Sequence, residues 1–237
     1  MAVQVKVVAL DIIETLFSLE PLRDYFIGAG LPGSVLELWF ATALRDAFAM
    51  AAAQSYEPLK TILESALDTV AAEHRVEIDS ERKRSLIKQM QSLPAHPDVA
   101  EGLTMLQQSG VQVIALTNGS KSSTKALLEK AGFDSLVKEI ISTDDVERAK
   151  PHREVYLHAA KKVGIEPGEL MLIASHPWDI HGAKSAGLKA AYLDRGKPFP
   201  SFMRSPDLSG ESLPALASSI AKPGSGIVSR AIEEITD

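Results

Sequence analysis

Polar side chains follow four apolar, strand-like runs of this chain, at the points where those runs end. They are Asp11, Thr15, Thr117, Asn118, Lys150, Ser175, His176 and Asp179. In a parallel sheet the carboxyl ends of all strands lie on one edge, which is where open α/β folds place their chemistry. These side chains can therefore converge on one pocket, although they are far apart in the sequence.

The residue types at these positions suit the formation and hydrolysis of a covalent intermediate. The carboxylate of Asp11 can attack an electrophile. Thr117 and Asn118, with the backbone N–H groups that open the next helix, can hold an anion. Lys150 can pair with Asp11 and keep it ionised, and Asp179 is a second carboxylate that can activate a water molecule.

Taken singly, each of these residues also has a plainer interpretation. Asp11 and Asp179 could cap helices, Thr117-Asn118-Gly119 could be a turn, and Lys150 could be a solvated lysine. Their order and their shared sheet edge favour a functional site, because four independent coincidences at one edge are improbable.

Strand-like and helix-like runs alternate through most of the chain. Strands are expected at residues 5–10, 111–116, 137–141, 170–174 and 190–193, and helices at residues 98–108, 121–131, 153–163 and 179–186. This alternation predicts an α/β fold with a doubly wound parallel sheet covered on both faces. After Pro198, only residues 212–220 and the last ten residues have a helical pattern.

Residues 19–92 have a different character, rich in Ala, Leu, Glu and Arg and without a strand-like run. Leu36, Trp39, Phe40 and Ala43 recur at intervals of three and four residues, which places them on one helix face. The segment predicts a bundle of about four helices inserted after the first strand. We expect an α/β core of residues 1–16 and 97–237 and a helical cap of residues 17–96, with the site between them.

Composition excludes several classes of function. With 45% hydrophobic and 24% charged residues the chain is typical of a globular protein. A net charge of -6 without a basic block argues against nucleic acid as a partner. The chain has no cysteine, which excludes a disulfide, a thiolate zinc site and a thiol nucleophile. No signal pattern or membrane-spanning run is evident, and we expect a cytoplasmic protein that does not bind membranes.

The order of these motifs resembles the haloacid dehalogenase (HAD) superfamily of hydrolases over nearly the whole chain. The matching positions are Asp11, Thr117-Asn118, Lys150-Pro151, Ser175 and Asp179, with the helical insert in the place of a cap domain. Most members are magnesium-dependent phosphatases with an Asp two residues after the nucleophile and an acidic pair in the last motif. Ile13 and Ser175 stand at two of those acidic positions, which leaves too little charge to hold Mg²⁺. We therefore expect neither a metal nor another cofactor.

The same two replacements are typical of the metal-independent L-2-haloacid dehalogenases (type II). The run from Ser175 to Asp179 resembles their last motif, with His176 where Asn is usual, and Phe17, Leu38-Trp39 and Tyr156 also resemble that branch. Two positions depart from it. Phe40 stands where those enzymes carry an Arg that helps to remove the halide, and Ile13-Glu14 replaces an aromatic-Gly pair. We interpret Glu14 as a solvated turn residue.

The resemblance implies metal-free hydrolysis of a carbon–halogen bond in a small 2-haloacid. Asp11 would form an aspartyl ester, Asp179 would activate the water that hydrolyses it, and Lys150 and Ser175 would orient the two carboxylates. The substrate contacts that it implies are Thr15, Thr117, Asn118, His176, Trp39, Phe40, Phe17 and Tyr156, although aromatic residues placed like Trp39 and Phe40 more often pack inside the cap.

The resemblance also implies a homodimer formed through the cap. Two alternatives stay open at this point. One is a HAD-type hydrolase of another substrate, such as a phosphate ester or another small acid. The other is a catalytically idle relative that binds a small anion.

Overall fold

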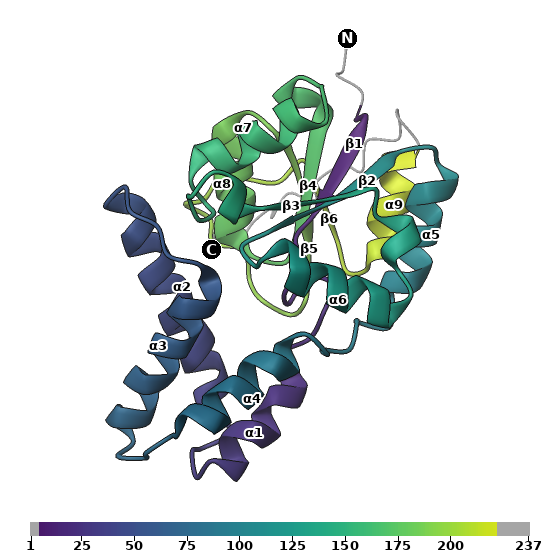
Figure 1. Ribbon diagram of the computed structural model, residues 1–237. Helices are drawn as coiled ribbons and strands as arrows, with labels where there is room; N and C mark the ends of the chain where they lie inside the picture. Colours follow the sequence, from purple (N-terminus) through teal and green to yellow (C-terminus); the bar gives the residue numbers. More distant parts are fainter. Residues whose placement is uncertain (1–4, 222–237) are drawn as a thin grey trace, which may run out of the picture.

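One parallel sheet organises the part of the chain that the structure, a computed structural model, describes: residues 5–221. In that range it has six strands in the order β3-β2-β1-β4-β5-β6 (Figure 1). The strands are β1 (Val7–Leu10), β2 (Gln112–Thr117), β3 (Glu139–Ser142), β4 (Leu170–Ala174), β5 (Lys189–Leu193) and β6 (Leu208–Gly210). The strand order turns at β1, so the crevice that such sheets use for ligands lies at the carboxyl end of this strand. The predicted fold class is confirmed.

Helices cover both faces of the sheet, which explains why the central strands are apolar throughout. On one face lie α7 (Arg153–Lys162) and α8 (Pro177–Ala186), and on the other α5 (Val99–Gln108), α6 (Lys121–Ala131) and α9 (Leu213–Ala221) (Figure 1). Side chains alternate between these faces along β1. Val7 and Ala9 belong to the apolar cluster with α7 and α8, whereas Val8 and Leu10 belong to the larger cluster on the other face.

The predicted elements of the core are present, with shifts of about two residues at their ends. The helix expected from residue 179 begins at Pro177, because proline suits the first turn of a helix, where no N–H partner is needed. Strand β6 was not predicted, because three residues containing Ser209 and Gly210 carry no apolar pattern. It forms by pairing with β5, with Leu193 opposite Gly210. The predicted helix at residues 212–220 is α9, and the last ten residues lie outside the described range.

Four α-helices between β1 and α5, in the described part of the chain, form the cap. They are α1 (Arg23–Gly28), α2 (Val35–Ala52), α3 (Leu59–Glu73) and α4 (Ser80–Met90). Figure 1 shows them grouped apart from the sheet and its covering helices. The predicted face of α2 is buried, and the indole N–H of Trp39 donates to the backbone oxygen of Leu63 on α3 at 2.9 Å. The cap boundaries at residues 17 and 96 stay a prediction.

The described helices offer no candidate for a membrane span: none combines the length and the apolar character that crossing a bilayer requires.

Candidate active site

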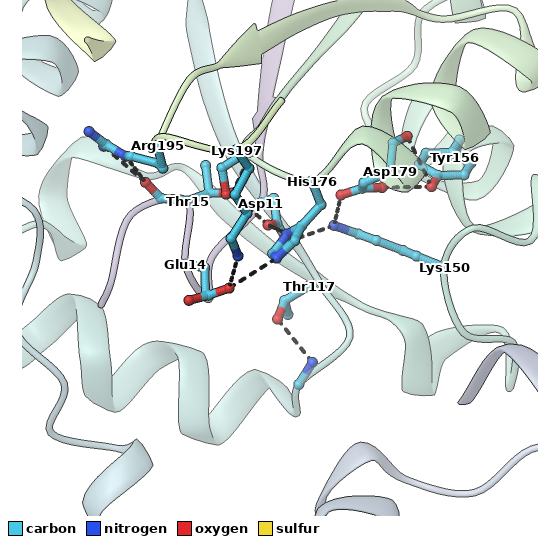
Figure 2. Close-up of polar contacts among 12 residues, drawn as sticks. Asp11, Glu14, Thr15, Thr117, Lys150, Tyr156, His176, Asp179, Arg195 and Lys197 are labelled. Atoms are coloured by element: carbon cyan, nitrogen blue, oxygen red, sulfur yellow. Dashed lines mark hydrogen bonds and ion pairs between the residues drawn. The ribbon is translucent and has the colours of Figure 1, made fainter. Parts of the chain in front are cut away.

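Asp11 lies at the carboxyl end of the central strand, where it is buried but borders a pocket. Its backbone N–H continues the ladder with β4 by donating to the oxygen of Ile173 at 3.0 Å. Its carboxylate has three partners (Figure 2). Lys150 Nζ donates to Oδ1 at 3.0 Å, Thr15 Oγ1 donates to Oδ2 at 2.6 Å, and His176 Nδ1 lies 3.2 Å from Oδ2. Burial by itself would raise the pKa of Asp11, but Lys150 and His176 hold this pKa well below its usual range.

One side of Asp11, which we call the buried flank, consists of Lys150, Asp179 and Tyr156. Lys150 Nζ also donates to Asp179 Oδ2 at 2.8 Å, and the Tyr156 hydroxyl donates to Asp179 Oδ1 at 2.6 Å. Burial would lower the pKa of Lys150, but its two carboxylate partners raise it, so the ammonium stays charged. Complete burial raises the pKa of Asp179 despite the neighbouring Lys150. The predicted Lys150–Asp11 pair is present, and Lys150 joins both carboxylates.

A glycine on α8 allows Tyr156 to reach Asp179. A Cβ atom at Gly182 would lie 2.5 Å from the Tyr156 hydroxyl oxygen and 2.6 Å from Cβ of Pro151. Both distances are shorter than real contacts, so a side chain here would push α8 away from α7. The small residue therefore sets the separation at which the phenol lies against the carboxylate.

Ser175 acts on Asp11 through Thr15. The backbone N–H of Ser175 donates to Thr15 Oγ1 at 2.9 Å, and the two hydroxyl oxygens lie 3.1 Å apart. Because the single hydroxyl proton of Thr15 is directed to Asp11, the Ser175 hydroxyl must be the donor in this pair. Arg195 fixes the same turn, since it donates to the Thr15 backbone oxygen at 3.0 Å (Figure 2). It also pairs with Asp98 at 2.9 Å.

The other side of Asp11, the pocket flank, consists of His176, Glu14 and Lys197. His176 lies between two carboxylates, with Nε2 3.6 Å from Glu14 Oε2, and Lys197 Nζ contacts the same Glu14 oxygen at 2.6 Å (Figure 2). Burial would lower the pKa of His176, but Asp11 and Glu14 raise it to about 9. Burial likewise opposes ionisation of Glu14, but His176 and Lys197 lower its pKa to about 2. His176 and Glu14 are therefore both charged at neutral pH.

The backbone at Glu14 is strained in a way that favours a functional role. Its φ is 63°, in the left-handed region that glycine adopts easily. For a residue with a Cβ atom this conformation is less stable by roughly 1–2 kcal/mol. Such strain persists where the surrounding structure holds it, and it gathers at functional sites. Glu14 is a turn residue as predicted, but its side chain is partly buried and ion-paired and is not simply solvated.

Sequence reasoning missed Lys197 altogether. It lies 183 positions after Glu14, in the loop that follows β5, and no motif marks it. The only sequence signal for this flank was that two residues differ from the usual motifs of the metal-independent L-2-haloacid dehalogenases. Glu14 stands in place of Gly, and His176 stands in place of Asn.

A small pocket of about 20 Å³ lies over Asp11, between the core and the cap. It is lined by Asp11, Ile13, Phe40, Leu44, Leu59, Thr117, Asn118, Gly119, His176 and Trp178. Of the predicted substrate contacts, the structure brings together Phe40, Thr117, Asn118 and His176. The Trp178 ring, which was not predicted, stacks on His176 with centroids 5.1 Å apart.

Donors for an anion are present on the core side of the pocket. Asn118 Oδ1 accepts from the Lys150 backbone N–H at 2.9 Å, so the amide nitrogen of Asn118 is the side-chain group that remains to donate.

Four predicted substrate contacts do not line this pocket. Trp39 and Phe17 are fully buried, the first against α3 and the second beside Phe133, with ring centroids 6.4 Å apart. Tyr156 and Thr15 are also buried, and their hydroxyls are bonded to Asp179 and Asp11. These side chains hold the site in place but do not face a bound molecule.

Within residues 5–221, no group of three or more His, Asp and Glu side chains is placed to bind a metal ion. The Lys150 ammonium instead lies between Asp11 and Asp179 and contacts both. The arrangement is therefore a buried carboxylate, Asp11, held by Lys150 and His176 below a mostly apolar pocket.

The family model for haloacid dehalogenase-like hydrolases matches residues 5–187. Among similar proteins, the haloacetate dehalogenase H-2 of Moraxella sp. (strain B) is 25% identical over 92% of this chain and 99% of its own length. The (S)-2-haloacid dehalogenase of Pseudomonas sp. (strain YL) is 25% identical over 90% of this chain and 93% of its own.

A solved structure with the same fold is the L-2-haloacid dehalogenase from Xanthobacter autotrophicus with chloropropionic acid covalently bound. It has a TM-score of 0.86 and 20% identity, and the match covers 92% of this chain and 98% of that one.

Proposed function

This chain belongs to the haloacid dehalogenase-like hydrolase family, and we propose that it hydrolyses the carbon–halogen bond of a small 2-haloacid through an ester on Asp11, without a metal. The observation that carries the proposal is the ionised carboxylate of Asp11, held by Lys150 and His176 below a small, mostly apolar pocket. The names of the similar proteins support the substrate class, as does the covalently bound chloropropionic acid in the Xanthobacter enzyme.

In the first step, Asp11 attacks the carbon that bears the halogen, a carbon–oxygen bond forms, and halide leaves with the bonding electron pair. The nucleophile and the leaving group lie on opposite sides of that carbon, so halide departs toward the cap, past Phe40, Leu44 and Leu59. The substrate carboxylate is held by the Asn118 amide and by the start of α6. The configuration at the carbon is inverted.

In the second step, water cleaves the ester, and the geometry favours His176 over Asp179 as its activator. Asp179 is fully buried, and its oxygens are engaged by Tyr156 and Lys150. His176 borders the pocket, lies beside the Asp11 carboxylate and has a second carboxylate, Glu14, at its other nitrogen. A base oriented by a carboxylate is the arrangement that activates nucleophiles in other hydrolases.

The charge on His176 supports this role once the ester has formed. In the resting enzyme two carboxylates keep the pKa of His176 high. Ester formation neutralises Asp11, so one of these two anions disappears and the pKa of His176 falls. The imidazolium then releases its proton to solvent, and the neutral imidazole takes one proton from the water that attacks the Asp11 carboxyl carbon. The bond from that carbon to the substrate oxygen breaks, the second water proton goes to this oxygen, and the 2-hydroxy acid leaves as the Asp11 carboxylate and the charged His176 are regenerated.

The experiment that tests the proposal measures halide and phosphate release from 2-haloacids and phosphate esters, with and without EDTA, followed by a single turnover in ¹⁸O-water. We expect halide release that survives chelation. With enzyme in excess, the solvent label should enter an Asp11-containing peptide and not the hydroxy acid. EDTA-sensitive phosphate release would favour the phosphatase alternative, and label appearing directly in the first product would show that Asp11 is not the nucleophile.

A further inference from the structure

A second, larger cleft adjoins the pocket over Asp11. It has a volume of about 260 Å³, compared with about 20 Å³ for the pocket over Asp11, and it lies between α3 and α4 of the cap and α6 of the core. The two cavities share four lining residues: Ile13, Leu59, Thr117 and Gly119. The two cavities therefore adjoin at these residues.

The lining of this cleft is predominantly apolar. Its side chains beyond the shared residues include Leu63, Ile87 and Met90 from the cap and Leu127 from α6. Direct contacts bridge the cap and the core at its rim. Gln91 Nε2 donates to Ser123 Oγ at 3.4 Å, and the Tyr56 hydroxyl donates to Asp144. The exposed lining of the cleft is thus mostly apolar, although polar residues such as Lys60, Ser120 and Thr124 also line it.

We propose that this cleft binds the alkyl chain of the substrate, and that the preferred substrates are 2-haloalkanoates of about five to eight carbons, larger than haloacetate. The inference rests on the proposed function, because it places the reacting carbon over Asp11. The substrate carboxylate stays at Asn118 on the core side, which leaves the alkyl substituent to follow the apolar surface. A hydrocarbon chain fits a lining of Leu, Ile and Met side chains, which have no polar group to satisfy.

The size of the expected preference follows from burial of methylene groups. Each methylene transferred from water into an apolar site improves binding about fourfold. Three additional methylenes therefore correspond to roughly a 60-fold rise in kcat/KM, until the chain fills the cleft.

The test compares 2-bromoacids of two to eight carbons with the wild type and two variants. Met90→Trp narrows the cleft, and Lys88→Trp adds the same ring at an exposed position of α4 that lines neither cavity. We expect kcat/KM to rise with chain length in the wild type and in Lys88→Trp. In Met90→Trp, the ratio of long-chain to short-chain kcat/KM should fall about tenfold or more. A flat or falling chain-length profile, or an unchanged ratio in Met90→Trp, would overturn the inference.

A binding measurement separates this inference from the proposed function. Calorimetry of the same 2-bromoacids with Asp11→Asn, alone and combined with Met90→Trp, reports affinity without turnover. Affinity that rises with chain length and depends on Met90 would support the alkyl-chain site even if no bromide were released by the wild type. Bromide release from short acids without a gain in affinity for long ones would retain the proposed function and reject the inference.

Discussion

The two flanks of Asp11 use the same kinds of charge in different surroundings. On the buried flank, the side chains of Lys150 and Asp179 are both 0% exposed. On the pocket flank, exposure rises outward, from 7% for His176 to 27% for Glu14 and 50% for Lys197. Each flank places a cation against Asp11 and a second carboxylate behind that cation (Figure 2).

The difference in burial separates two tasks. A charge network without access to water cannot exchange protons easily, and its interactions are strong because screening is weak. The buried flank is therefore suited to fixing the position and ionisation of Asp11. The pocket flank borders the cavity and reaches solvent at Lys197, so it can lose and regain a proton during a reaction cycle.

Asp11→Asn should have the largest effect, because both flanks serve this one carboxylate. An amide has nearly the same shape but is a poor nucleophile, so we expect halide release to fall about 10⁴-fold or more. Circular dichroism and the melting temperature should show an intact fold, since Lys150 keeps its contact with Asp179. Activity within tenfold of wild type would contradict the assignment of the nucleophile.

Matched lysine substitutions should separate the flanks by stability. Lys150→Met leaves Asp11 and Asp179 buried without their cation, and breaking such a buried network costs about 3–5 kcal/mol. Lys197→Met removes a half-exposed partner of Glu14 and should cost about 1 kcal/mol or less. Urea unfolding measures both. Equal losses of unfolding free energy in the two variants would show that burial does not distinguish the flanks.

His176→Asn should trap the ester if the pocket flank activates water. General-base catalysis contributes about 10²-fold or more, so hydrolysis should become much slower than ester formation. We expect a burst of one equivalent of halide, with an adduct on the Asp11 peptide in mass spectrometry. The matched variant Asp179→Asn should not accumulate this adduct. The reverse pattern would assign water activation to Asp179.

The free energy of unfolding should depend on pH through the pocket flank and not through Lys150 on the buried flank. We expect this effect to be smaller than those of the substitutions above. The pKa of His176 is about 9 in the folded protein, above its ordinary value of 6.5. The resulting stabilisation is fully present below pH 6.5 and is lost as the pH rises through 9, by on the order of 3 kcal/mol. The pKa of Lys150 is raised above its ordinary 10.5, so the Lys150 ammonium stays charged in this window.

Urea unfolding between pH 6 and pH 10 checks this prediction, with His176→Asn as the control. The decline in stability should be present in the wild type and strongly reduced in the variant. A wild-type stability that is constant across this range would contradict the charged state of His176.

Much of the fold and half of the site follow from local sequence. The apolar runs that become β1, β2 and β4 each end at a polar residue that lies at the site: Asp11, Thr117 and Ser175. Lys150 was placed by its position after a strand and before Pro151. These predictions work because strand periodicity and chain order determine which residues reach the carboxyl edge of a parallel sheet.

The direction and depth of side chains were harder to predict. Trp39, Phe17 and Tyr156 were expected to contact substrate, and each is buried with its polar group, where it has one, bonded inside the protein. An aromatic residue at a suitable motif position can face the cavity or pack one layer behind it. Sequence spacing does not distinguish these outcomes.

The sequence by itself determined that Asp11 is a carboxylate at a sheet edge, and that Ile13 and Ser175 stand where acidic metal ligands are otherwise found. Only the tertiary structure decided the partnership of His176 with Glu14 and Lys197. That partnership depends on a left-handed backbone at Glu14 and on a loop 183 positions away. A strand can be recognised from its own periodic sequence pattern. A contact between distant loops, such as those that follow β1 and β5, forms only when the sheet has placed the carboxyl ends of those strands along one edge.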